Sequence, residues 1–413
     1  METRLALVIV VDGLRASALG TYGNTTYPTP YLDALAARAV VIEWLLADSP
    51  HLSDFYRAAW SGHHSYLESN RKEEHILPEI IRQSGGRSWL MTDDFWVAEQ
   101  ARESGFAEVV LFEQQNAKSA RKISETHFSR FFAQAIEQLA VWQKEVEENK
   151  VHGLLWVHLR GLGGPWDAPL AMRAQLLDEE DPTPLPIVEP PASLEIGDDP
   201  DELLSYQVSY GAQVELLDSC IAGFVEAFEE LESSAPRITM LSGSRGFALG
   251  EHKLIGHSVE KLYSEQLHLP CLLLMGRRQD PLPRVGGFAH PADLFGTLLD
   301  WFGINNRSYN LTQSLLRYFS DDERLLRQVS LARHAEQRMI RTPAWMLRTS
   351  SEQGSESLYV KPDDRWEVND VASRCPEIVE QLCQLLSECG FVNEEVMTLQ
   401  GIELPKELIS PQR

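Results

Sequence analysis

The sequence contains few cysteines, and they lack the spacing that cysteine-based sites require. Its 413 residues include five, which is an odd number: Cys220, Cys271, Cys375, Cys383 and Cys389. A small secreted scaffold held by disulfides needs a larger, patterned set. This composition therefore excludes a disulfide framework and indicates a reducing compartment.

Basic residues are scarce as well. Lys and Arg number 37 against 61 Asp and Glu, so the formal net charge is -24. Such a charge repels nucleic acid and anionic membranes, and we expect neither as a partner. Part of the excess is local, because residues 178–202 hold ten acidic residues and no Lys or Arg. These residues also lack periodicity, which predicts a surface insertion.

Long hydrophobic runs are missing too. No run reaches the length of a transmembrane helix, and the apolar run Leu5–Val11 leads directly into Asp12 without a signal-peptide cleavage site. We therefore expect a cytoplasmic protein without a membrane segment. Neither a glycine-rich phosphate loop nor a Ser-His-Asp order stands out in the chain.

The most informative stretch that is present begins the chain. Leu5–Val11 is apolar and rich in β-branched residues, which is typical of a strand buried on both faces of a parallel sheet. Asp12 and Gly13 follow it, at the end of a strand where open α/β sheets place their ligand sites. Two interpretations of Asp12 are open: a site residue, or a cap of the following helix.

Strands and helices alternate along the rest of the chain, which predicts an α/β fold with a mostly parallel sheet sandwiched by helices. We expect one α/β domain over residues 1–325 and a small subdomain of antiparallel sheet and helix over 326–413. The expected strands are 5–11, 40–46, 88–92, 108–112, 153–159, 237–242 and 269–276, and the main expected helices are 53–62, 77–83, 124–149, 203–231, 293–302 and 376–388.

With its motifs in order, the chain resembles the sulfatase family of the alkaline-phosphatase superfamily. VIVVDGLRASALGTYGN with TPYLDALAARA is similar to the family's opening segment, and SGSRGFALGEHKLIGHSVEKLYSEQLHLPCLLL to its later "SDHGExLGEHGxxGK" segment. HPADLFGTLLDWFGI is similar to its "DLxPTLLDLAGI" helix, and MIRTPAWMLRT with SLYVKPDDRWEVNDVA to its C-terminal sheet. The resemblance implies the same α/β architecture.

The resemblance also implies a nucleophile, and here the sequence departs from the family. Sulfatases make a formylglycine from a Cys or Ser in a Cys/Ser-x-Pro-x-Arg motif. Matching ADSPHLSDFYRAAWSG to that motif places Leu52 at the nucleophile and Tyr56 at the arginine. A shift by one residue makes Ser53 the nucleophile and Arg57 the arginine, with Phe55 at the proline. Both registers stay open.

The implied metal pocket departs from the family in a similar way. Asp12 matches the first metal ligand, Ser244 and Arg245 match the usual "DH" or "DN" pair, and His257 matches a lysine. His252 is kept near the edge of the pocket. An arginine cannot coordinate a cation, whereas Ca²⁺ needs six or more oxygen ligands. We therefore expect no cofactor, and calcium or magnesium only if the protein is active.

A physical hypothesis follows for Arg245. If the side chains of Asp12 and Arg245 both project from strand ends to the position of the family's metal pocket, the guanidinium takes the place of the cation. Its charge then balances the buried carboxylate of Asp12. This predicts a contact well within about 6 Å. The alternative is that Arg245 points into solvent.

Two further clusters have a functional and a structural interpretation. His63 and His64, with His51 and Asp54 nearby, are a possible transition-metal site or an ordinary loop. Asp93 and Asp94 follow a strand, where a capping turn is commoner than an acid pair. The family's mid-chain histidine region matches His158 and the glycine-rich turn after it, and the Trp166–Asp167 turn is expected to shape the pocket wall.

The sequence therefore favours a sulfatase-family protein whose hydrolytic site has decayed and which has a binding or regulatory role. The alternative is an active hydrolase of sulfate or phosphate esters with a rewired site around Asp12, Ser53, His63 and His257. A third interpretation is an Arg245-centred pocket that binds a small anion without turnover.

Overall fold

The computed structural model describes residues 3–66, 76–113, 118–257, 262–276, 282–304, 312–320, 327–350, 355–390 and 402–410. The chain divides into two compact units. Unit 1 comprises residues 1–41, 75–258 and 270–283, and unit 2 comprises residues 42–74, 259–269 and 284–413. The domain boundary predicted at residue 325 lies outside the described residues.

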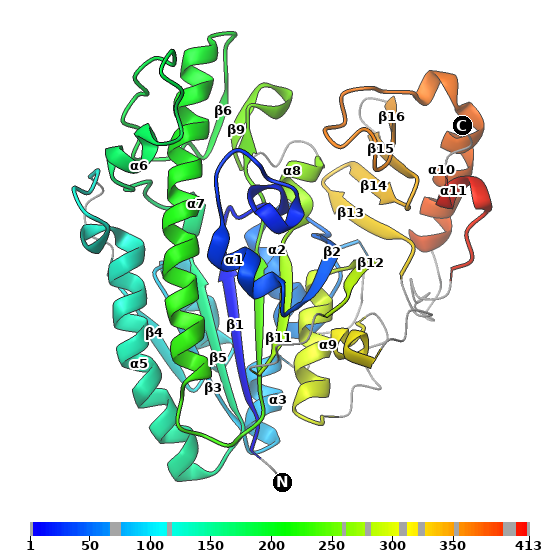
Figure 1. Cartoon of the computed structure of the whole chain (residues 1–413). Coiled ribbons are helices and arrows are strands. Elements are labelled where there is room, and N and C mark those ends of the chain that lie inside the picture. Colours follow the sequence, from blue (N-terminus) through cyan, green and yellow to red (C-terminus); the bar gives the residue numbers. More distant parts are fainter. Residues whose placement is uncertain are drawn as a thin grey trace. The chain divides into compact units, whose positions relative to one another are not determined.

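Unit 1 contains a mostly parallel sheet, which confirms the predicted fold class (Figure 1). Within unit 1 its strand order is β11–β7–β1–β5–β3–β4, and Val40 and Val41 at the start of β2 pair with β11. The strands other than β2 and β11 are parallel to one another, and β11 is antiparallel to β7 and to β2. The bounds are β1 Leu5–Val11, β2 Val40–Leu46, β3 Arg87–Thr92, β4 Glu108–Leu111, β5 Gly153–Leu159, β7 Arg237–Gly243 and β11 Cys271–Met275.

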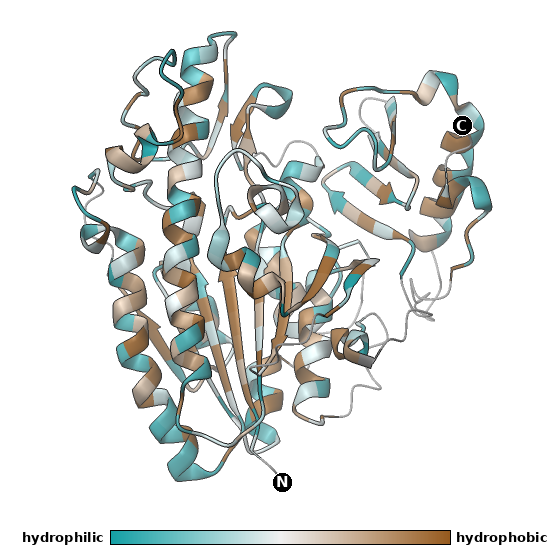
Figure 2. Cartoon of the chain, viewed as in Figure 1, coloured by the Kyte–Doolittle hydropathy of each residue, from teal (hydrophilic) through white to brown (hydrophobic). Residues whose placement is uncertain are grey.

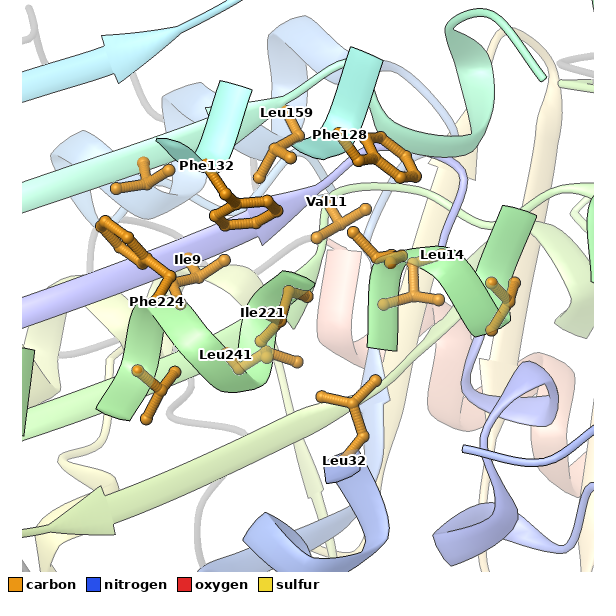
Figure 3. Close-up of a cluster of buried hydrophobic side chains, with 14 of the residues drawn as sticks. Ile9, Val11, Leu14, Leu32, Phe128, Phe132, Leu159, Ile221, Phe224 and Leu241 are labelled. Carbon is orange, nitrogen blue, oxygen red and sulfur yellow. The ribbon is translucent and has the colours of Figure 1, made fainter. Parts of the chain in front are cut away.

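The first strand lies in the middle of this sheet and is buried along its whole length, as its composition predicts. The long helices α5 (His127–Asn149) and α7 (Pro200–Glu229) pack their apolar sides into the same core (Figure 3). Ile9 and Val11 of β1 meet Phe132 of α5 and Phe224 of α7 there. Figure 2 shows the hydrophobic residues gathered on the strands of the sheet.

The other helices of unit 1 are short: α1 Pro30–Ala36, α3 Leu77–Gln83, α4 Phe95–Glu103 and α6 Leu170–Ala174. Single 3-10 turns lie at Ala16–Ala18, Gly20–Tyr22, Ile123–Glu125, Gly161–Gly163 and Glu251–Lys253. Among the described residues of the whole chain, no helix combines the length and apolar composition that crossing a bilayer requires.

The acidic insertion contains a strand that its composition did not predict. Within residues 178–202, β6 (Ser193–Glu195) pairs with β9 (Leu254–Gly256), which also pairs with β8 (Ala248–Leu249). Most of the insertion is exposed, as expected. A three-residue strand that pairs with a distant segment leaves no periodic pattern in the sequence, so the pairing was not visible there.

Two other boundaries differ from the prediction for local reasons. The expected strand 269–276 is interrupted at Pro270, which has no N–H to donate, and becomes β10 (His268–Leu269) and β11. Helix α7 begins earlier than expected because Pro200 is compatible with the first helical turn and Asp199 caps it by accepting from the amide of Asp201, 3.0 Å away.

Unit 2 contains the predicted small antiparallel sheet. Its order is β13–β14–β15–β16, with bounds Ser330–His334, Gln337–Arg341, Trp345–Ser350 and Ser355–Val360. The predicted helix α10 (Pro376–Gly390) packs into the same core as this sheet. The unit also includes α2 Leu52–Ser61, α8 Ser264–Leu267, α9 Pro291–Trp301, α11 Lys406–Ile409, β10, β12 Arg284–Ala289, and 3-10 segments at Leu315–Ser320 and Ala372–Arg374.

Candidate functional site

The carboxyl ends of β7, β1 and β5 lie level with one another in unit 1. Val11, the last residue of β1, is in register with Leu159 on one side and Gly243 on the other. The amide of Asp12 donates to the carbonyl oxygen of Leu159 at 2.9 Å. The residues that follow these strands are therefore brought together, which is why Asp12 and Ser244 meet despite their separation in sequence.

Asp12 is buried, and it receives three side-chain hydrogen bonds from the residues predicted to share its pocket. Arg245 binds it through one edge of the guanidinium, with Nε donating to Oδ1 at 2.9 Å and Nη2 donating to Oδ2 at 2.8 Å. The hydroxyl of Ser244 donates to Oδ1 at 2.7 Å. The predicted Asp12–Arg245 contact is confirmed.

The charge of Arg245 controls the ionisation of Asp12. Burial on its own would raise the pKa of this carboxyl, but Arg245, followed by His257, outweighs burial and holds the pKa well below its usual range. Burial lowers the pKa of Arg245, yet Asp12 raises it overall. The pair is thus a carboxylate and a guanidinium at any physiological pH.

His257 completes the cluster on the other side of Asp12. Its Nδ1 lies 2.9 Å from the carbonyl oxygen of Gly246, an acceptor, so Nδ1 carries the hydrogen. Its Nε2 lies 3.7 Å from Oδ2 of Asp12, is buried, and has no hydrogen-bond partner in the described part of the chain. Burial lowers the pKa of His257 to about 4, so the imidazole is neutral near pH 7.

The glycine-rich turn after β5 packs directly against this cluster. A Cβ added to Gly163 would lie 2.9 Å from Nε2 of His257 and 3.1 Å from Oδ2 of Asp12. The indole N–H of Trp166 donates to the carbonyl oxygen of Leu162, 2.8 Å away, within the same turn, and its place in the pocket wall stays a prediction. A side chain at position 163 would point toward His257 and Asp12, and glycine avoids this crowding.

His252 and Glu251 lie in the turn before β9. Glu251 accepts from Arg15, with Nη1 2.6 Å from Oε1, in a largely buried ion pair. His252 adopts a left-handed backbone conformation with φ of 54°. The Arg15–Glu251 pair therefore stabilises the turn, and His252 lies next to Glu251 in it.

The segment matched to the nucleophile belongs to unit 2. Leu52 is the first residue of α2, and Ser53 is the second and is exposed. Tyr56, at the position of the family's arginine, is buried. His51 occupies the N-cap position before Leu52 without a side-chain capping hydrogen bond, and its Nε2 lies 2.9 Å from Nδ1 of His334. Sequence reasoning missed His334 because it lies 283 residues away.

Asp48 and His64 form a buried cluster of their own in unit 2. Nδ1 of His64 lies 3.5 Å from Oδ2 of Asp48, and its ring stands edge-on to that of His290. Burial lowers the pKa of His64 to about 3 and raises the pKa of Asp48 to about 6. This environment is that of a core histidine, and it favours the structural interpretation of His64.

The adjacent aspartates after β3 have different roles. Asp94 caps α4 as expected, by accepting from the amide of Val97 at 3.0 Å. Asp93 is buried instead and binds Nε2 of His127 at 2.6 Å and the amide of Arg160 at 2.8 Å. The sequence offered no signal for the pairing of Asp93 with His127, because the two are far apart in the chain.

The residues around Asp12 do not fit a calcium or magnesium ion. Either ion needs several oxygen ligands, most of them carboxylates or water. Asp12 supplies one carboxylate, and both of its oxygens already accept hydrogen bonds from Ser244 and Arg245. Arg245 also adds a fixed positive charge. Within the described residues, no three His, Cys, Asp or Glu side chains are grouped so that they could hold a metal ion.

Comparisons with known proteins agree with this architecture. A family model described as Sulfatase matches residues 4–304. No curated protein sequence matches the chain. Among solved structures, the chain is similar to a 2-O GAG sulfatase, with 15% identity, a TM-score of 0.71, and 94% of this chain and 92% of the other covered.

Two other solved structures are similar to a comparable extent. One is a protein in complex with its substrate D-glucosamine-2-N,6-O-disulfate, with 15% identity, a TM-score of 0.71, and 94% and 97% of the two chains covered. The other is the phosphonate monoester hydrolase of Agrobacterium radiobacter, with 14% identity, a TM-score of 0.67, and 94% and 96% covered. At these identities the structures establish the fold.

Proposed function

Because this chain belongs to the sulfatase family, whose model matches residues 4–304, we propose that it is a member without sulfatase turnover and with a binding or regulatory role. The observation that carries the proposal is the bidentate Asp12–Arg245 pair. Members of this family typically use a metal ion, and here a guanidinium lies against the carboxylate that would bind it. A permanent positive charge in that place opposes the entry of a divalent cation.

The nucleophile segment supports the same proposal. In the register without a shift, the chain has Leu52 at the reactive position, and a leucine side chain has no nucleophilic atom. In that register the arginine is also replaced, by the buried Tyr56. Loss of the cation and of the nucleophile would each abolish the family's chemistry, and the two changes point in the same direction.

We also propose a ligand for the remaining pocket, a small anion or an anionic group on a sugar. Two nitrogens of the Arg245 guanidinium bind Asp12, and the third, Nη1, has no hydrogen-bond partner among the described residues. The Arg245 side chain is 22% exposed, so solvent reaches part of it. Because one similar structure holds D-glucosamine-2-N,6-O-disulfate, a sulfated glucosamine is the first ligand to test.

The proposal includes a cytoplasmic location. It is supported by the cysteines, none of which forms a disulfide bond in the described part of the chain. Cys271 and Cys389 are buried, so their thiols are also shielded from partners in solution.

The experiment combines metal analysis with turnover of aryl sulfate and aryl phosphate in the presence of added Ca²⁺ or Mg²⁺. We expect no stoichiometric metal and no turnover above the buffer blank. The variant Arg245→Asn restores an oxygen donor and removes the charge, so it should gain affinity for Ca²⁺, whereas Arg245→Lys should not. Turnover by the unaltered protein that disappears in Asp12→Ala would contradict the proposal.

One observation favours the alternative, an active ester hydrolase. Ser53 is exposed in the first turn of α2, a ten-residue helix whose N-terminus stabilises negative charge on a nearby oxygen. If Ser53 is the nucleophile, Ser53→Ala abolishes turnover while Ser61→Ala, at the other end of the same helix, leaves it unchanged. If the unaltered protein shows no turnover, the alternative is excluded.

A further inference from the structure

Two histidines from distant parts of the chain meet at the start of α2 in unit 2. Nε2 of His51 lies 2.9 Å from Nδ1 of His334, and the two ring centroids are 4.7 Å apart with the rings tilted by 55°. Both side chains are half-buried, so solvent reaches them. The pair belongs to unit 2, whereas Asp12 belongs to unit 1.

Both imidazoles are attached to ordered elements. His51 is the N-cap of α2, and its amide donates to the hydroxyl of Ser49, 3.3 Å away. The same hydroxyl donates to Oδ2 of Asp54 in the first turn of the helix. His334 ends β13 at the hairpin that leads to β14, where its pairing with Gln337 fixes the strand end. The two nitrogens are therefore held close together by the backbone.

The carboxylate of Asp54 acts electrostatically on the histidine pair. Burial lowers the pKa of His334, the neighbouring His51 lowers it further, and the Asp54 carboxylate acts in the opposite direction. The lowered pKa favours the neutral imidazole of His334, and the charge of Asp54 favours a cation beside it. Neutral imidazole nitrogens are the usual protein ligands of Zn²⁺, Ni²⁺ and Cu²⁺.

We propose that His51 and His334 form a binding site for a divalent transition metal ion, with ligands other than Asp12 and Ser244. Two ligands at about 2.1 Å from one ion and at a right angle to each other are about 3 Å apart, which the observed 2.9 Å matches. This angle suits the tetragonal coordination of Ni²⁺ and Cu²⁺, and a small opening suits tetrahedral Zn²⁺.

The rest of the coordination sphere is supplied by water or by an exogenous anion. Within the described residues no third His, Cys, Asp or Glu side chain completes a protein-only site. A site with two protein ligands is open, so it binds more weakly than a closed structural site and exchanges its other ligands readily. The competing arrangement is a hydrogen bond in which one imidazole donates to the other.

The test is calorimetric titration of the chelator-treated full chain with NiCl₂, ZnCl₂ and CaCl₂ near neutral pH. We expect one Ni²⁺ or Zn²⁺ per chain and no binding of Ca²⁺ at this site. His51→Gln and His334→Gln should each weaken Ni²⁺ binding at least tenfold, because each removes one of two ligands. His63→Gln, in the same segment as His51, is the matched control and should change the affinity less than twofold.

X-ray absorption at the nickel edge provides the second readout. The expected spectrum has two imidazole nitrogens and several oxygens, and one imidazole is lost in each of the two variants. Binding that is substoichiometric, or that both glutamine variants retain at full affinity, overturns the proposal and leaves the hydrogen-bonded pair. The outcome is separate from that for Asp12, because Asp12→Ala should leave nickel affinity unchanged.

Discussion

The guanidinium of Arg245 lies alongside the carboxylate of Asp12 and bonds both of its oxygens, at 2.9 and 2.8 Å. Only 6% of the Asp12 side chain is exposed, so little water is left to solvate its charge. A buried carboxylate needs either a cation or charged hydrogen-bond donors. Here an amino acid of the chain itself supplies the positive charge, and the charge balance of the pocket does not depend on a bound metal.

The first prediction concerns the loss of that charge. Arg245→Ala leaves the buried Asp12 carboxylate with Ser244 as its remaining close donor, and we expect the free energy of unfolding to fall by about 2–4 kcal/mol. Asp12→Asn should cost less, since Arg245 is partly exposed and water can solvate it. Urea unfolding of the two variants at neutral pH measures both losses.

The double variant and added cation provide the controls. Asp12→Asn combined with Arg245→Ala removes both charges, and its loss should be smaller than the sum of the two single losses. Millimolar Ca²⁺ should raise the melting temperature of Arg245→Ala and leave that of the unaltered protein unchanged. Strict additivity of the two single losses would mean that the residues do not interact.

Much of this site could be predicted from the sequence because its residues follow strands that the sequence marks clearly. Asp12 and Arg245 end apolar runs, and parallel strands bring their carboxyl ends to one edge. The seven buried residues of β1 were visible for the same reason.

The contacts that escaped prediction join segments with no local signal. His334 meets His51, and His127 meets Asp93, across 283 and 34 residues. A histidine is equally compatible with a strand end, a helix start or a loop, so its partner depends on tertiary packing alone. The same holds for β6, whose three residues form a strand through their antiparallel pairing with β9.

The second prediction concerns stability in acid. Burial lowers the pKa of His64 to about 3 and the pKa of His257 and His268 to about 4. These histidines titrate near 6.5 when unfolded, so the unfolded chain binds more protons between about pH 4 and 6.5 and stability falls as the pH falls through that window. Burial raises the pKa of Asp48 and Asp218 to about 6, which opposes this trend.

The histidines outweigh the two carboxylates in number and in the size of their shifts. We expect a net loss on the order of 2–5 kcal/mol in unfolding free energy between about pH 7 and pH 4. Thermal melts across this range measure it. His257→Gln removes one titrating group and should flatten the profile, while a profile that rises toward acid would show that the carboxylates dominate.

The third prediction concerns the glycine turn. Gly163→Ala places a methyl group 2.9 Å from Nε2 of His257, closer than packing allows, so that His257 or the turn must shift. We expect a loss of about 1–3 kcal/mol in unfolding free energy. Gly223→Ala is the matched control: the residue lies in α7, is exposed, and has nothing within 4 Å of the added Cβ.

The control substitution Gly223→Ala should raise the free energy of unfolding, whereas Gly163→Ala lowers it. Alanine in place of an exposed helical glycine stabilises by about 0.5–1 kcal/mol, because it restricts the unfolded chain and favours the helix. Chemical denaturation of both variants therefore separates the general effect of adding a methyl group from the crowding at Gly163. Equal effects of the two substitutions would remove the argument that the pocket requires glycine.

The last prediction concerns the attachment of the acidic insertion. Arg173 is fully buried, and its guanidinium donates to the carbonyl oxygens of Trp166 at 2.6 Å and Ile187 at 2.7 Å and to the hydroxyl of Ser209 at 2.9 Å. It thereby ties the turn beside the pocket, the insertion and α7 together. Arg173→Gln cannot reach all three acceptors, so we expect residues 178–202 to be cleaved several-fold faster in limited proteolysis. Arg121→Gln removes an exposed guanidinium in the same unit and should leave the rate unchanged; equal cleavage of both variants would mean that other contacts hold the insertion.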